Sequence, residues 1–240
     1  MEACESGAIA VVDGGVRIDR DNCSSCDKCV EVCNTGALAF VSRHMSLAEV
    51  LEEVEKDSLF YRNSNGGVTV GGGEPLDQAD FVSDLLEACH QRGLHTTLDT
   101  CGHAGTQKLE RVLEWVDLVL YDLKHMDPLR HREITGFSNN LILRNAKAIA
   151  RLGIPMVMSI PIIPTTNDTV ENLEATAEFI TGLNGVARVR LLPYHHAGIG
   201  KYHNLDRTYY LDGIEAPREE GLLTAKELME SYGLECELGG

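Results

Sequence analysis

The chain has 240 residues, 43% of them hydrophobic, and 21 basic against 37 acidic residues give a formal net charge of −16. This size allows one substantial core, with or without a small appendage. The acidic balance argues against nucleic-acid binding, and no apolar run approaches the roughly 18 residues that a membrane helix needs. The start lacks the basic residues of a secretory signal. We therefore expect a cytoplasmic protein without membrane association.

Five of the eight cysteines lie in the first 33 positions, and four of them form the motif C-x2-C-x2-C-x3-C: Cys23, Cys26, Cys29 and Cys33. This is the bacterial ferredoxin spacing for a 4Fe–4S cluster, in which the fourth cysteine ligates a different cluster from its three predecessors. Soft thiolates in a tight loop suit iron. A structural zinc site is the alternative interpretation of the same residues.

A partial internal repeat indicates which cluster each cysteine serves. Residues 2–9 align with residues 31–38, so Cys4 corresponds to Cys33 as the fourth cysteine of an earlier copy, whose first three cysteines would precede Met1. Cys33 then points to a second cluster whose other ligands are not in the sequence. We expect one complete ligand set: Cys4, Cys23, Cys26 and Cys29.

From residue 46 onward, strand-like and helix-like segments alternate, starting with a helix near residues 47–54. This alternation favours parallel strands joined by helical crossovers. Five strands are too few for a closed eight-stranded barrel and suit an open or partial one. We predict strands at 68–70, 96–98, 118–121, 156–163 and 189–192, and further helices at 81–89, 108–115, 141–152, 170–183 and 224–232.

Polar or glycine-rich residues follow every predicted strand. Each group alone has an ordinary explanation, such as a helix cap, a surface ion pair or a solvated loop. Because the carboxyl ends of parallel strands gather the ligands of such folds, we expect the five groups to form one mouth. They are residues 71–75, 99–102, 122–125, 161–168 and 193–196.

The charges at this predicted mouth limit its ligand. Three acidic residues beside Lys124 suit a zwitterion, or a carboxylate held through a bound cation. The glycine stretch is not a nucleotide P-loop, because it lacks the G-K-[ST] ending. We expect Cys101 to pack within the mouth, and Cys89 and Cys236 to be core residues.

The motifs G-G-E-P, D-T-x-G, Y-D-L-K-H-M-D, T-G-F-S-N-N-L-I-L-x-N, P-I-I-P-x-x-N-D and L-L-P-Y-H follow the ferredoxin-type segment in order. Over essentially the whole chain they resemble the glycyl-radical-enzyme activating enzymes of the radical S-adenosylmethionine superfamily, similar to pyruvate formate-lyase activating enzyme. The resemblance implies an α/β fold, a partial (β/α)6 TIM-like barrel at residues 43–240. It also implies a small α+β ferredoxin-like head at residues 1–42.

The resemblance further implies an oxidoreductase that uses 4Fe–4S clusters and S-adenosylmethionine. A cluster reduces the ligand to methionine and a 5′-deoxyadenosyl radical, which takes hydrogen from a glycine of a partner glycyl radical enzyme. A flavodoxin- or ferredoxin-like protein is the expected reductant. Pyruvate formate-lyase itself is disfavoured as the partner, because its activase lacks the ferredoxin insert.

Nine residues match the S-adenosylmethionine-binding motifs of this family. The turn ending in Glu74 is implied to receive the methionyl amino group. Two aspartates and Thr100 are implied to surround the methionyl end with a monovalent cation, Lys124 to meet its carboxylate, and His195 to lie on the nucleoside side. The nine are Gly72, Gly73, Glu74, Asp99, Thr100, Asp122, Leu123, Lys124 and His195.

Two departures from the family pattern affect the expected activity. Ser159 stands where an arginine is usual, and no C-x3-C-x2-C loop for the catalytic cluster occurs among the 240 residues. We therefore expect an N-terminally truncated chain that lacks the first barrel strand, keeps strands two to six and is inactive as given, with no catalytic residue to assign. One alternative is a short non-enzymatic electron carrier or partner-binding protein. A radical enzyme for a small molecule is another, less favoured.

Overall fold

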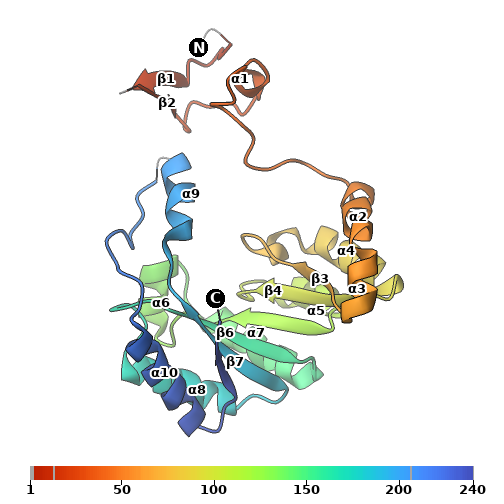
Figure 1. Ribbon diagram of the computed structural model, residues 1–240, viewed down its shortest axis with the longest axis vertical. Helices are drawn as coiled ribbons and strands as arrows, with labels where there is room; N and C mark the ends of the chain where they lie inside the picture. Colours follow the sequence, from red (N-terminus) through yellow and green to blue (C-terminus); the bar gives the residue numbers. More distant parts are fainter. Residues whose placement is uncertain (1–2, 13, 206, 240) are drawn as a thin grey trace. The chain divides into compact units, whose positions relative to one another are not determined.

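The computed structural model describes residues 3–12, 14–205 and 207–239 (Figure 1). The chain divides into two compact units, residues 1–46 and 47–240. The sequence placed the boundary a few residues earlier, between 42 and 43. Among the described residues, no helix is both long and apolar enough to span a bilayer.

The first unit is a small hairpin with a short helix. β1 (Ile9–Val12) pairs with β2 (Gly15–Ile18) in antiparallel register, and α1 (Lys28–Glu31) follows. Ala8 is the only buried residue among those described in this unit, and Phe40 is 56% exposed. A unit this small without an apolar core usually depends on metal ions or disulfides for its stability.

The second unit is built on a six-stranded, wholly parallel sheet whose strands lie in chain order. Because the order never reverses, the crossovers all run in one direction and place the helices on one face, as in a barrel and unlike a doubly wound sheet. The strands are β3 (Gly67–Val70), β4 (His95–Thr100), β5 (Leu118–Asp122), β6 (Met156–Ile162), β7 (Val186–Pro193) and β8 (Cys236–Leu238).

The predicted α/β architecture with five parallel strands is confirmed, and β8 adds a strand that the sequence did not predict. Most helices of this unit cover the convex side of the curved sheet, whereas α9 lies apart from the sheet beyond the end of β7 (Figure 1). The helices are α2 (Leu47–Lys56), α3 (Ser58–Ser64), α4 (Ala79–Gln91), α5 (Thr106–Leu113), α6 (Pro128–Thr135), α7 (Asn140–Leu152), α8 (Val170–Thr181), α9 (Ile199–Asn204) and α10 (Glu219–Ser231), with the 3₁₀ turns η1 (Pro75–Gln78) and η2 (His196–Gly198).

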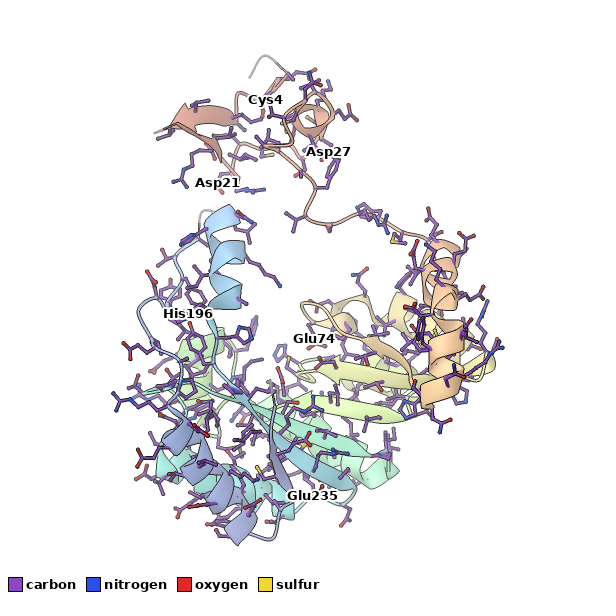
Figure 2. All side chains as sticks on the ribbon, viewed as in Figure 1. Cys4, Asp21, Asp27, Glu74, His196 and Glu235 are labelled. Atoms are coloured by element: carbon purple, nitrogen blue, oxygen red, sulfur yellow. The ribbon has the colours of Figure 1, made fainter. Side chains whose placement is uncertain are left out.

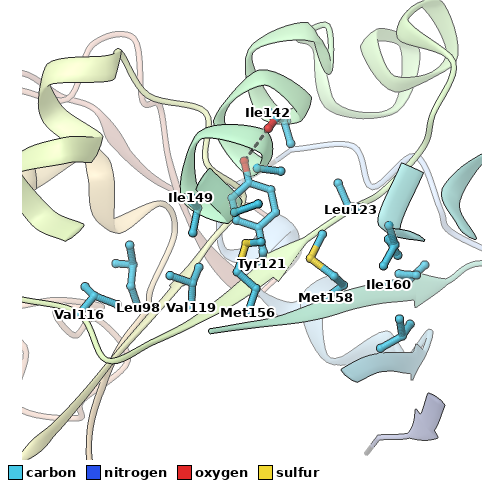
Figure 3. Close-up of a cluster of buried hydrophobic side chains, with 14 of the residues drawn as sticks. Leu98, Val116, Val119, Tyr121, Leu123, Ile142, Ile149, Met156, Met158 and Ile160 are labelled. Atoms are coloured by element: carbon cyan, nitrogen blue, oxygen red, sulfur yellow. Dashed lines mark hydrogen bonds between the residues drawn. The ribbon is translucent and has the colours of Figure 1, made fainter. Parts of the chain in front are cut away.

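Alternate strand residues pack against the helices and leave the intervening residues on the inner face of the sheet. On β6, Met156, Met158 and Ile160 join the core, together with Tyr121 of β5 and Ile149 of α7 (Figure 3). Side chains in a strand alternate between faces, so the residues between these core positions face away from the helices. The inner face is therefore where the polar residues of the strands gather.

Tyr121 anchors the helical layer to the sheet. Its side chain is fully buried, and its hydroxyl donates a hydrogen bond of 2.7 Å to the carbonyl oxygen of Ile142 in α7 (Figure 3). Burial raises the pKa of this phenol far above its ordinary value, which keeps the hydroxyl protonated as a donor. Gly102 lies against the hydroxyl end of this side chain, and a Cβ there would collide with the hydroxyl.

Candidate functional site

Glu74 joins the loop after β3 to the end of β4. It lies at the start of η1 (Figure 2), where its Oε1 accepts hydrogen bonds from Thr100 Oγ1 at 2.6 Å and from Leu76 N at 3.1 Å. Its Oε2 accepts from Cys101 N at 3.0 Å and from Cys101 Sγ at 2.9 Å. Four donors thus occupy the carboxylate, so the Glu74 side chain holds two strand ends together.

The glycine turn that precedes Glu74 lies beside Asp99. A Cβ on Gly71 would stand 3.5 Å from the Cβ of Asp99, whereas a Cβ on Gly72 or Gly73 would meet no atom within 4 Å. Gly72 has a φ of +144°, a conformation that L side chains rarely adopt. The turn therefore exposes bare backbone to open space next to a carboxylate.

Asp99, Asp122 and Lys124 gather on the inner face. Lys124 Nζ lies 3.2 Å from Asp122 Oδ2, and both side chains are about one third exposed. Asp99 is open to solvent, yet burial of its surroundings raises its pKa, and the Asp122 and Glu74 carboxylates raise it further. Arg190 and Lys124 lower the same pKa, so their positive charges reach this position.

A cavity of about 270 Å³ adjoins these charged residues. Glu74, Asp122 and Lys124 form part of its wall, and Cys101 lies beside them. Burial and the neighbouring Glu74 raise the pKa of the Cys101 thiol to about 11, which keeps it protonated at neutral pH. This agrees with the interpretation of Cys101 as a packed, unreactive thiol.

Buried asparagines brace the loops around the mouth. Asn167 Nδ2 donates to the carbonyl oxygens of Lys124 at 2.8 Å and Pro161 at 2.6 Å, and its Oδ1 accepts from Ile163 N at 2.8 Å. Asn145 Nδ2 donates to the carbonyl oxygens that follow β4, at 2.7 and 2.8 Å. The sequence motifs contained these residues, but their bracing role was not predicted.

The remaining predicted ligand residues lie in different settings. Asp99 and Thr100 belong to β4 itself, because the strand continues through Thr100 and does not end at residue 98 as predicted. The side chain of Leu123 packs in the helix-side core, which leaves its backbone to face a ligand. His195 is exposed and accepts a hydrogen bond of 3.2 Å from Ala197 N. Within the described residues, no hydrogen bond or ion pair joins His195 to the charged cluster of Asp99, Asp122 and Lys124.

The predicted internal repeat has a structural counterpart in the first unit. Gly7 N donates to Cys4 O at 3.1 Å and Gly36 N to Cys33 O at 3.2 Å, and these glycines have φ values of +67° and +69°. Leu38 N also donates to Cys33 Sγ at 3.2 Å, and this bond is the main cause of a lowered pKa for the Cys33 thiol. The two turns therefore share one conformation, as the aligned sequences predict.

The cysteines of the first unit are all free, and the donor set suits an iron–sulfur cluster in kind. In the described part of the chain, however, no three His, Cys, Asp or Glu side chains are arranged to hold a metal ion. The thiols are therefore not gathered into a closed ligand set in this arrangement.

Comparisons with known proteins agree with the fold. Residues 31–180 match the family model of the radical SAM superfamily. The chain is 40% identical over 232 residues to the isethionate sulfite-lyase activating enzyme of Nitratidesulfovibrio vulgaris, covering 95% of this chain and 73% of that protein. It is 38% identical over 257 residues to the trans-4-hydroxy-L-proline dehydratase activating enzyme of Clostridioides difficile, covering 94% and 85%.

Solved structures show the same architecture. A domain of a pyruvate-formate lyase-activating enzyme from Bacteroides vulgatus superposes with a TM-score of 0.62 at 33% identity, covering 73% of this chain and 99% of that one. Streptococcus suis SuiB bound to S-adenosylmethionine shares the fold at 17% identity, with a TM-score of 0.63 and coverage of 85% and 46%. The chain therefore belongs to the radical SAM superfamily, whose cofactors are a 4Fe–4S cluster and S-adenosylmethionine, and within it to the oxidoreductase-type activating enzymes of glycyl radical enzymes.

Proposed function

We propose that this chain binds S-adenosylmethionine on the inner face of its sheet, as part of an activase that places a radical on a glycine of a partner enzyme. The observation that carries the proposal is the convergence of Asp99, Asp122 and Lys124 beside an open glycine turn. A ligand with an ammonium, a sulfonium and a carboxylate matches such a mixture of charges.

The side chains present fit the methionyl end of this ligand. Because Glu74 is saturated by its four donors, the bare backbone of the turn is the surface available to the ammonium group. Asp99 and Asp122 supply negative charge for the sulfonium or for a monovalent cation, with Thr100 and the Leu123 backbone nearby. Lys124 supplies positive charge for the carboxylate, and His195 lies on the nucleoside side.

The reaction chemistry comes from the cluster, which reduces the sulfonium when it is bound. No C-x3-C-x2-C motif for that cluster occurs among the 240 residues. We assign no residue of this chain to it. The contribution that we propose for the chain's own residues is to bind and orient the ligand. A polypeptide of these 240 residues should bind S-adenosylmethionine without cleaving it.

For residues 1–42, which belong to the first unit, we propose a ferredoxin-like cluster domain. Cys4, Cys23, Cys26 and Cys29 would hold one 4Fe–4S cluster, and Cys33 would serve a second. Two observations support this. The turns at Cys4 and Cys33 share one conformation, and the described residues of the unit bury one apolar side chain, so another source of stability is needed.

The proposed partner is a glycyl radical enzyme, with a flavodoxin- or ferredoxin-like reductant. The relatives activate enzymes of several kinds, including a sulfite-lyase, a dehydratase and a decarboxylase. We also propose a cytoplasmic location, because all eight cysteines are free and such cysteines are typical of a reducing compartment.

Equilibrium dialysis against labelled S-adenosylmethionine tests the proposed site. The unsubstituted chain should bind one ligand, and D122N should weaken binding by about tenfold through the lost charge. As a matched control, D84N removes an exposed aspartate of α4 and should bind normally. Failure of the unsubstituted chain to bind, or equal affinities for all three proteins, would contradict the proposal.

A further inference from the structure

A single row of polar side chains crosses the inner face of the sheet. The pairing register places Asp122 of β5 beside Ser159 of β6, Ser159 beside Arg190 of β7, and Arg190 beside Glu237 of β8. The flanking residues of this row, such as Met158 and Leu191, are buried in the helix-side core. Side chains of parallel neighbours in register point to the same face, so all four row members point inward.

Arg190 is held by its stem and leaves the end of its guanidinium available. Its Nε donates a hydrogen bond of 3.3 Å to Glu237 Oε1, and Gly239 packs so closely on the stem that a Cβ would stand 2.7 Å from Arg190 Cδ and Cγ. Within the described residues, neither Nη1 nor Nη2 of Arg190 is hydrogen-bonded to the protein. A guanidinium offers five donors in a rigid fork that matches a carboxylate.

Ser159 leaves room between the two charged members of the row. It is only 4% exposed, and its small side chain separates Arg190 from Asp122 on the inner face. Neighbouring strands are about 4.8 Å apart, a span that the long arginine side chain can cross. The positive charge of Arg190 reaches as far as Asp99, whose pKa it lowers against the opposing effect of burial.

Lys124 and Arg190 are the two cations that can serve the carboxylate of a ligand at this site. Lys124 already lies 3.2 Å from Asp122, so its charge is shared with a protein carboxylate. Arg190 is also paired with a carboxylate, through its Nε and Glu237 Oε1 at 3.3 Å, but among the described residues both Nη atoms at the end of its fork are left without a hydrogen bond. When Glu237 and its second partner Arg188 are included, the cations Lys124, Arg188 and Arg190 face four carboxylates, those of Glu74, Asp99, Asp122 and Glu237. The inner face then keeps one excess negative charge, which complements the single net positive charge of S-adenosylmethionine.

We propose that Arg190 is a ligand-positioning residue whose guanidinium reaches over Ser159 and binds the α-carboxylate of S-adenosylmethionine. This inference rests on the proposed function, because it presumes the ligand site on the inner face. In this arrangement Asp122 attracts the positively charged groups of the ligand, and Arg190 binds its negatively charged carboxylate.

Two ligands that differ only in the carboxylate test the inference. Dialysis with S-adenosylmethionine and with decarboxylated S-adenosylmethionine separates carboxylate binding from every other contact. R190Q should weaken S-adenosylmethionine by about 10- to 100-fold, the range for a lost charge-assisted hydrogen bond, and leave the decarboxylated ligand within about twofold. R188Q is the matched control, because Arg188 Nη1 donates to the same Glu237 at 3.1 Å. It should change neither affinity.

The double variant S159R/R190S moves the arginine one strand along the row. Because the guanidinium still faces the same site, it should recover most of the affinity for S-adenosylmethionine that R190S alone loses. If R190Q does not fold, R190K replaces it in the test, because lysine keeps the positive charge and a long aliphatic side chain. It should retain a preference for the carboxylate ligand while binding it less tightly than arginine does.

The possible results separate the two proposals. No binding of either ligand to the unsubstituted chain would overturn the proposed function and this inference with it. Normal binding to the unsubstituted chain, together with equal losses for both ligands in R190Q or no loss at all, would overturn the inference alone. Such a result would leave Arg190 as a brace between β7 and β8.

Discussion

Thr100 Oγ1 donates a hydrogen bond of 2.6 Å to Glu74 Oε1 and so ties the end of β4 to the loop after β3. The hydrogen bonds from Leu76 and Cys101 complete this connection. We expect E74Q to lower the free energy of unfolding by about 1–3 kcal/mol, because the amide nitrogen cannot accept from the Cys101 N–H. Urea unfolding measures the change. E110Q, on the exposed side of α5, should stay within about 0.5 kcal/mol, and equal effects would contradict the bracing role.

Gly102 should tolerate no side chain. Its φ is +69°, and a Cβ would collide with the Tyr121 hydroxyl that bonds to Ile142. G102A should therefore cost about 2–4 kcal/mol of folding free energy through strain and displacement of the tyrosine. Gly105 in the same loop has a φ of −62° and open space around it, so G105A is the matched control. Thermal unfolding measures the stability of both variants. Equal losses of stability in G102A and G105A would contradict the proposed collision with Tyr121.

Asn167 should be indispensable to the mouth. N167D keeps the shape of the side chain but turns an acceptor toward the carbonyl oxygens of Lys124 and Pro161. We expect a loss of about 3 kcal/mol, because two hydrogen bonds are replaced by repulsion. N140D, at the exposed start of α7, should be neutral or slightly stabilising, because negative charge is favoured at a helix N-terminus. Denaturant unfolding measures the stability of N167D and N140D. Equal stabilities of the two variants would contradict the bracing role of Asn167.

Cys101 should resist alkylation at neutral pH. With a pKa of about 11, its thiolate fraction at pH 8 is about one in a thousand, and the labelling rate should rise as the pH approaches that value. Because Glu74 contributes to the raised pKa, E74Q should speed the labelling of Cys101 by iodoacetamide. Mass spectrometry of tryptic peptides measures the rate at each thiol, with the exposed Cys26 as the internal reference. Rapid labelling of Cys101 at pH 7 would contradict the assigned environment.

The first unit should take up about four irons per chain after anaerobic reconstitution, the content of one 4Fe–4S cluster. C26S should lose most of this iron, whereas C33S should keep it, because Cys33 belongs to a second ligand set. Iron and sulfide analysis measures both variants against the unsubstituted chain. About eight irons, or stoichiometric zinc without iron, would show that the assignment is wrong.

The sequence predicted most of the second unit because its strands and helices have strong local patterns. Five of the six parallel strands were identified from short β-branched or apolar runs. β8 was missed because it spans only the three residues Cys236–Leu238 and pairs with β7 alone. The end of β4 was predicted too early, because polar Asp99 and Thr100 read as loop residues although the strand continues through them.

The site residues that the sequence missed depend on distant parts of the chain. Asn167 binds a carbonyl oxygen 43 positions earlier, so no local pattern shows its role. Arg190 lies in a run of apolar and basic residues that does not distinguish it from Arg188. Only the register, which places it beside Ser159, shows that it faces the charged cluster. Ser159, where the family resemblance led us to expect an arginine, thus has an arginine for its neighbour.

Hydrogen–deuterium exchange of the chain with and without S-adenosylmethionine tests the central claim most directly. We predict protection at residues 71–74, 99–102 and 122–125, which surround the charged cluster on the inner face. A separate pocket of about 700 Å³ between the loop at Gly213 and α10 should show no change. Protection confined to that pocket, or no protection anywhere at saturating ligand, would contradict the assignment of the inner face as the S-adenosylmethionine site.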